Sequence, residues 1–121
     1  MIHAYDKVYL EKARVSLARM LDFAVYDLHY DIKVFFDMFI NSGIAARFEK
    51  GDFRIIAGKS GIELAYDVAE ISGDDKRDIK PRFTSNRSEE YWTGWALAYF
   101  QWESGLSFAE IIKYIPIKDI L

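Results

Sequence analysis

The residue types that could carry out catalysis are few and scattered in this chain. His3 and His29 are the only histidines, and neither belongs to an H-x-x-x-H or E-x-x-H metal-binding pattern. Cysteine is absent, which excludes disulfides and zinc–thiolate sites, and no G-x-S-x-G sequence offers a serine nucleophile. The adjacent acids at 74–75 and 89–90 would point in different directions on a helix. The sequence therefore supports no catalytic residue, no metal site and no cofactor.

Aromatic side chains are concentrated in residues 89–104, EEYWTGWALAYFQWES, which hold all three tryptophans. At 100° per residue, one helix face carries Trp92, Trp95, Ala96, Tyr99, Trp102 and Leu106. We expect this face to be buried in the core. The alternative is a ligand pocket in which Trp95, Tyr99 and Trp102 stack on a small molecule and Glu103 accepts a hydrogen bond, and this alternative requires a cavity of at least ~300 Å³.

A second candidate site is the polar tract of residues 74–87, DDKRDIKPRFTSNR. Its C-terminal half is basic through Lys80, Arg82 and Arg87, with Phe83 between them. Long turn-rich segments inside compact domains are either solvated loops or functional ones. We expect a solvated loop, with contact of these three cations to an anion or an acidic partner as the alternative.

Two short patterns have the spacing of nucleic-acid or nucleotide sites. Residues 42–59 have a helix–turn–helix spacing but only a faint excess of basic residues. Gly58-Lys59-Ser60 matches the end of a phosphate-binding loop, yet Phe53 stands where the upstream glycine is required. A net charge of −3 and a pI near 5.4 provide no general attraction for nucleic acid or anionic membranes. DNA binding through residues 42–59 therefore stays a minor alternative.

Hydrophobic periodicity predicts six helical segments, over residues 4–28, 31–40, 44–49, 60–71, 89–104 and 108–114. In the first segment the solvated stripe is expected to consist of Lys7, Glu11, Arg14 and Asp22, with Lys12 and Arg19 beside them. Their ends carry capping signals: Ser60-x-x-Glu63 and Ser107-x-x-Glu110 match the capping box, Ser88 precedes the aromatic segment and Gly105 follows it. Residues 53–56 are predicted to be a docked linker, and residues 117–121 an apolar terminal turn.

Size and composition predict one domain, residues 1–121. Hydrophobic residues make up 51% of the chain and charged residues 29%, which excludes wholesale disorder. Tyr91, Gly94 and Ala98 form a flank of mostly small side chains on the aromatic segment that would let another backbone come close. We predict an all-α, single-domain orthogonal bundle of five or six helices, with residues 89–104 as the central aromatic helix, enclosed by the helices that begin near residues 4, 31 and 60.

No apolar run approaches the ~20 residues needed to span a bilayer. The N-terminal stretch carries charges throughout and lacks the basic region followed by an apolar run that marks a signal peptide. We expect a cytoplasmic protein without membrane contact.

The pattern Tyr91-Trp92-x-Gly94-Trp95-x-Leu97-Ala98-Tyr99-x-Gln101-Trp102, followed by Gly105 and Ser107-Phe108, resembles the YWxGWxLAYxQW core of a family of small uncharacterised bacterial helical proteins. Residues 20–28 and 35–36 look similar to the same family, so the resemblance covers most of the chain. Genes of this kind often lie beside other small proteins, some of them toxin-like. The resemblance therefore implies an accessory or antitoxin-like binding role.

The sequence thus leads to a non-catalytic protein-interaction module, an antitoxin-like or regulatory partner of a neighbouring gene product. Homo-oligomerisation remains open. The two alternatives are a small-molecule-binding protein with an aromatic pocket and a DNA-binding regulator.

Overall fold

The chain folds into a bundle of helices. A computed structural model describes residues 3–82 and 87–120, and within these ranges there are seven α-helices, two 3₁₀ turns and no strand. The α-helices are α1 (Leu10–Tyr26), α2 (Ile32–Asn41), α3 (Ile44–Glu49), α4 (Phe53–Ile56), α5 (Gly61–Ile71), α6 (Glu89–Ser104) and α7 (Phe108–Tyr114), and the 3₁₀ turns are η1 (Lys7–Tyr9) and η2 (Ile117–Asp119). The all-α prediction is confirmed.

Helix ends follow the capping signals of the sequence. The Asp31 carboxylate accepts hydrogen bonds from the backbone N–H groups of the first turn of α2. Both predicted capping boxes form, at Ser60 for α5 and at Ser107 for α7. α6 begins after Ser88, whose hydroxyl accepts from the Tyr91 N–H, and ends at Gly105, which has a left-handed φ of 71°. Local side-chain capping therefore sets these boundaries.

Two local predictions differ from the structure. Residues 53–56, predicted as a linker, form the short helix α4, because the Asp52 carboxylate caps the Arg54 N–H. This helix makes the bundle one helix larger than predicted. Asp22, assigned to the wet face of the first helix, is only 7% exposed, because its carboxylate accepts a hydrogen bond from the Ser88 hydroxyl at the start of α6.

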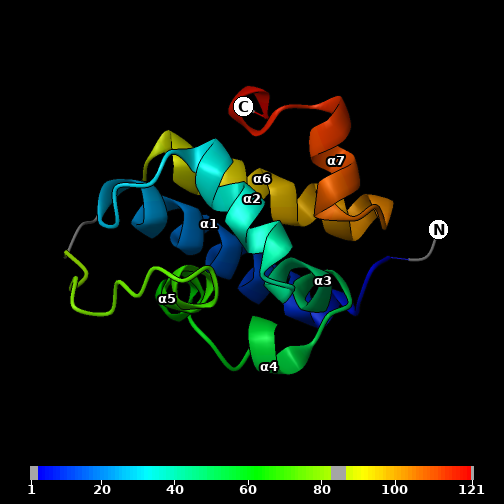
Figure 1. Ribbon diagram of the computed structural model, residues 1–121. Helices are drawn as coiled ribbons and strands as arrows, with labels where there is room; N and C mark the ends of the chain where they lie inside the picture. Colours follow the sequence, from blue (N-terminus) through cyan, green and yellow to red (C-terminus); the bar gives the residue numbers. More distant parts are fainter. Residues whose placement is uncertain (1–2, 83–86, 121) are drawn as a thin grey trace.

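Helix α1 lies in the middle of the bundle, whereas the sequence placed α6 there. In Figure 1, α6 lies behind α1, α5 lies beside it and α2 crosses in front. Two glycines let the neighbours approach closely. A Cβ atom at Gly94 of α6 would lie 2.7 Å from the Ala18 Cα, and one at Gly61 of α5 would lie 2.4 Å from the Ser16 carbonyl oxygen. The predicted close approach at Gly94 is confirmed, and α1 is the helix that it serves.

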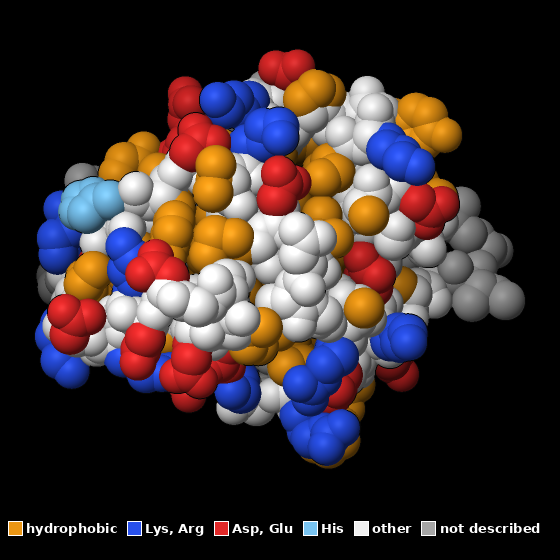
Figure 2. Space-filling view, in the orientation of Figure 1, with side chains coloured by type: hydrophobic (Ala, Val, Ile, Leu, Met, Phe, Trp, Pro, Cys, Tyr) orange, Lys and Arg blue, Asp and Glu red, His pale blue; other side chains and the backbone are white. Residues whose placement is uncertain are grey.

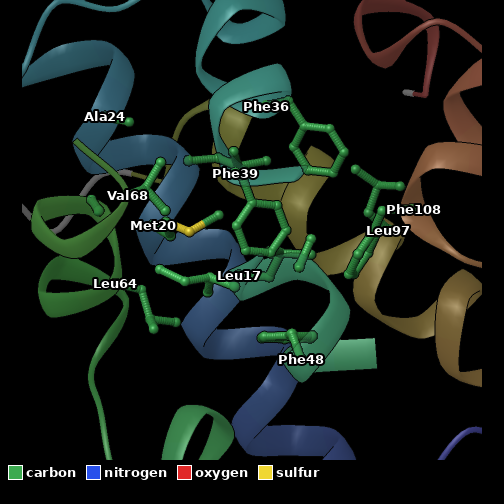
Figure 3. Packing of buried hydrophobic residues seen from close by; sticks show 14 of the residues in the cluster. Leu17, Met20, Ala24, Phe36, Phe39, Phe48, Leu64, Val68, Leu97 and Phe108 are labelled. Carbon is green, nitrogen blue, oxygen red and sulfur yellow. The ribbon is translucent and has the colours of Figure 1, made fainter. Parts of the chain in front are cut away.

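Four of the five fully buried phenylalanines form a cluster, referred to below as the phenylalanine cluster: Phe36, Phe39, Phe48 and Phe108. These rings come from α2, α3 and α7 and lie around Leu17 of α1 and Leu97 of α6 (Figure 3). Their ring centroids lie 5.4 to 6.3 Å apart at tilted or edge-on angles, the geometry that aromatic pairs prefer. The cluster therefore joins the short helices to the long ones.

The described part of the predicted loop, residues 74–82, is attached to the bundle by side chains. The Tyr66 hydroxyl donates to the Ile79 carbonyl oxygen, and the Arg77 guanidinium bonds Asp67 and Glu70 of α5. Positions 83–86, which include Phe83, lie outside the described residues, as does Leu121 of the predicted terminal turn. Residues 74–82 thus lie against α5 by specific bonds.

Asp67 is expected to stabilise the fold in an acid-sensitive way. Burial by itself would raise the pKa of Asp67, but hydrogen bonds from Lys59 and Arg77 outweigh burial and hold that pKa below its usual value. Because the folded-state pKa is the lower one, the stabilisation is present above the unfolded-state pKa of about 3.9 and is lost as the pH falls through the folded-state value.

We expect Asp67→Asn to lower the free energy of unfolding at pH 7 by about 1 kcal/mol, and we expect this difference to vanish near pH 2. Urea denaturation of both proteins across this pH range measures it. Asp37→Asn serves as the control, because the Asp37 side chain is 47% exposed and, within residues 3–82 and 87–120, pairs only with Lys33, its neighbour one helical turn away. An Asp67→Asn effect that is equally large at both pH values contradicts the assignment.

Candidate functional site

The two faces of α6 differ in their exposure to solvent. On the face toward α1, Leu97 and Ala98 are fully buried. On the opposite face, Trp92 is 38% exposed, Tyr99 41% and Phe100 44%. The prediction that this aromatic face is the buried one is therefore wrong for most of its length.

The reason lies in the distance between α1 and α6. Backbone contact at Gly94 leaves little room between the two helices at that point, so Trp92, Tyr99 and Phe100 lie on the other side. Tyr91, in the first turn of α6, is a bulky ring that is nevertheless only 2% exposed. Leu106, the last member of the predicted face, is 36% exposed just beyond the end of the helix. Trp102 is the exception and is only 5% exposed.

Two arginines lie against the exposed rings. The Arg14 guanidinium of α1 lies 4.3 Å from the ring centroid of Trp95 and 5.1 Å from that of Tyr99. The Arg87 guanidinium lies 5.6 Å from the ring centroid of Trp92. Such cation–π contacts hold the charged groups at the surface of the rings. We call this surface the outer strip, and it consists of Arg14, Arg87, Trp92, Trp95, Tyr99 and Phe100.

Trp102 and Glu103 are engaged by the N-terminal segment. The Trp102 indole N–H donates to the Tyr5 carbonyl oxygen at 2.7 Å, and the His3 ring stacks on the indole with centroids 3.8 Å apart. The Glu103 carboxylate lies 3.2 Å from the His3 Nε2. These contacts shield Trp102 from solvent and attach residues 3–5 to α6.

A cavity of 330 Å³ lies along one edge of the outer strip, between α6 and the C-terminal segment. It is lined by Arg14, Ala96, Leu97, Tyr99, Phe100, Ile111, Ile115, Asp119 and Ile120. Its volume meets the minimum that the ligand hypothesis sets. Of the four residues proposed for that pocket, Tyr99 lines it, whereas Trp95, Trp102 and Glu103 do not appear among its walls.

The three cations proposed as an anion contact, Lys80, Arg82 and Arg87, lie in different surroundings. Arg82 donates to the Asp27 carboxylate at the end of α1, through its backbone N–H at 2.9 Å and its guanidinium at 3.4 Å. Lys80 is exposed to solvent. Arg87 lies over the first turn of α6 and belongs to the outer strip. Of these three cations, Arg87 is therefore the one that contacts the aromatic residues of α6.

The segment considered for DNA binding carries little unopposed positive charge. The Asp52 carboxylate pairs with both Arg47 and Arg54, at 3.0 and 3.4 Å, and Lys59 pairs with Asp67. Figure 2 shows the face with α2, α3 and α4, on which acidic and basic side chains are interspersed. A nucleic-acid surface needs a basic patch or stripe, and this face offers none.

Sequence reasoning missed two members of the outer strip, Arg14 and Phe100. Arg14 was assigned to the solvated face of the first helix, because its contact with Trp95 depends on how α1 and α6 pack. Phe100 could have been found from the sequence. At 100° per residue the six aromatic residues of α6 span about half of the helix circumference, with Phe100 at one edge, so they cannot all face one core.

Searches of the described ranges, 3–82 and 87–120, identify no group of three acidic or histidine side chains placed to hold a metal ion. In the same ranges no helix is long and apolar enough to cross a membrane. Comparison of the chain with protein-family models, with curated proteins and with solved structures finds no match.

Proposed function

We propose that this protein is a non-catalytic protein-interaction module of the cytoplasm that binds its partner through the outer strip of α6. The partner is another protein encoded beside it, as the resemblance to the YWxGWxLAYxQW family implies, and the role is antitoxin-like or regulatory. The observation that carries the proposal is the exposure of Trp92, Tyr99 and Phe100 on a single helix face, with arginines lying against that face.

The composition of the strip is that of a binding hot spot. Tryptophan, tyrosine and arginine are the residues whose truncation most often costs an interface a large part of its affinity. Contiguous exposed apolar surface on a folded monomer often marks a contact site. The arginines are already held against the rings, so little side-chain freedom is lost when a partner covers them.

The test uses the product of each neighbouring gene. Each product is co-expressed with this chain, any complex is identified by mass spectrometry, and the dissociation constant is measured by calorimetry with both proteins purified. We expect Trp92→Ala and Tyr99→Ala each to weaken binding about tenfold or more. Phe53→Ala on α4 is the matched control, because Phe53 is 64% exposed but lies outside the strip.

Two results would argue against the proposal. One is the absence of a complex with every neighbouring gene product at concentrations of about 100 μM, well above typical dissociation constants of specific complexes. The other is a complex whose affinity is unchanged by Trp92→Ala and Tyr99→Ala. A complex weakened equally by the Phe53→Ala control would place the contact elsewhere.

The small-molecule alternative has one specific observation in its favour, the 330 Å³ cavity beside Tyr99. Ligand pockets have volumes of about 300–1,000 Å³, so this cavity suits only a small ligand.

A further inference from the structure

The guanidinium of Arg14 is held in place but is left with hydrogen-bonding capacity. Its Nε donates to the Trp95 carbonyl oxygen at 3.2 Å, and its Cζ lies 4.3 Å from the ring centroid of Trp95 and 5.1 Å from that of Tyr99. Among the described residues no carboxylate lies within ion-pair distance of Arg14, and its two terminal nitrogens have no hydrogen-bond partner. The side chain is half-buried. A fixed, partly desolvated cation with free donors is prepared to receive an anion.

Arg14 forms one wall of the 330 Å³ cavity, and most of the other walls are apolar. Tyr99 and Phe100 provide ring surfaces, and α7 and the C-terminal segment provide three isoleucines: Ile111, Ile115 and Ile120. Asp119 is the other charged residue of the lining. A ligand in this cavity therefore meets one cation, one carboxylate and a largely hydrocarbon surface.

We propose that this cavity is a binding site for a monocarboxylate carried on an apolar group. The carboxylate accepts two parallel hydrogen bonds from the terminal nitrogens of Arg14, and the apolar group packs between Phe100 and the isoleucines. The site shares Arg14, Tyr99 and Phe100 with the outer strip. It is tested with small carboxylates, so the result does not depend on whether the outer strip binds a protein.

The charges of the lining select one negative charge over two. A single guanidinium matches the planar geometry of a carboxylate, and the low polarity around it strengthens a charge-assisted hydrogen bond. A second negative charge would have no cation in the lining and would face Asp119. Phosphate monoesters and dicarboxylates are therefore poor ligands for this site.

The experiment uses 3-phenylpropanoate as the probe and its neutral amide, 3-phenylpropanamide, as the matched comparison. Calorimetry measures binding, and tryptophan fluorescence reports on the site because Arg14 lies on the Trp95 ring. We expect saturable binding of the acid with a dissociation constant on the order of 1 mM or lower, and binding of the amide about tenfold weaker.

Two variants locate the binding in the cavity. Arg14→Gln removes the charge, and Ala96→Leu narrows the cavity without touching Arg14. We expect each to weaken binding of 3-phenylpropanoate about tenfold, while Arg54→Gln, at an exposed arginine of α4, leaves it unchanged. Circular dichroism and urea denaturation establish whether the variants are folded. If Arg14→Gln does not fold, Ala96→Leu alone tests whether binding occurs in the cavity.

The source of the carboxylate is distinguished by a second pair of probes. Acetyl-Gly-Gly-Phe with a free C-terminus represents a protein chain end, and the same peptide with an amidated C-terminus is its comparison. Tighter binding of the free peptide than of 3-phenylpropanoate identifies a chain terminus as the ligand, and the reverse order identifies a free acid. Absence of saturable binding of both acids up to about 10 mM, or binding that is unchanged in both cavity variants, overturns the proposal.

Discussion

Replacement of Phe39 by alanine is expected to lower the free energy of unfolding by about 4 kcal/mol, since truncation of a buried phenylalanine costs about 3–5 kcal/mol. Phe39 is fully buried, and its ring centroid lies 5.4 Å from that of Phe36, 6.3 Å from that of Phe48 and 5.6 Å from that of Phe108. It thus contacts all other members of the phenylalanine cluster. Truncation would leave a cavity bordered by three helices.

Urea denaturation followed by circular dichroism measures this effect. Tyr114→Ala is the control, because Tyr114 is 82% exposed on α7 and its truncation should change the free energy of unfolding by about 0.5 kcal/mol or less. Phe39→Leu should give an intermediate loss, since it removes less volume. If Phe39→Ala lowers the free energy of unfolding by less than about 1 kcal/mol, the phenylalanine cluster does not make the large contribution to stability that we expect.

Replacement of Gly94 by alanine is expected to destabilise the protein by about 2 kcal/mol, although alanine is the better helix former by about 1 kcal/mol. The added Cβ would lie 2.7 Å from both the Ala18 Cα and the Leu17 carbonyl oxygen. These atoms belong to backbone and cannot move aside as a flexible side chain would. α1 and α6 must therefore separate along their contact.

The sign of the change is the decisive result for Gly94→Ala. Ala96→Gly, on the outer side of the same helix, measures the difference in helix propensity between alanine and glycine. It should lower the free energy of unfolding by about 1 kcal/mol. Thermal and urea unfolding of both variants give the comparison. An increase in stability for Gly94→Ala would show that the helix backbones are not in contact there.

The helices and their ends were predictable from sequence because they depend on neighbours in the chain. Ser60 and Glu63 satisfy each other's backbone groups across one turn, and Gly105 adopts the left-handed conformation that ends α6. Residues 53–56 escaped prediction because a four-residue helix has no hydrophobic period, and its start depends on the carboxylate of Asp52.

The candidate site was predictable only in part. The sequence predicts the aromatic segment, Tyr99 as a cavity residue and the close approach at Gly94. The buried face of α6 was assigned wrongly, because hydrophobicity alone does not distinguish a face that packs from a face that is exposed. Side-chain size decides which face packs on α1, since the backbone of α1 approaches α6 at Gly94, and Ala98 is fully buried on the same face.

By itself, the sequence determined which segments are helical, where capping residues end them, and that one helix carries an unusual number of aromatic rings. These properties depend on hydrogen bonds and side-chain periodicity within a few residues. Only the tertiary structure decided that α1 lies in the middle, that Trp92, Tyr99 and Phe100 of α6 are left at the surface, and that Arg14 reaches Trp95 and Tyr99 from another helix. Those outcomes depend on how closely two backbones approach, which is set by contacts between residues about 80 positions apart, such as Arg14 and Trp95.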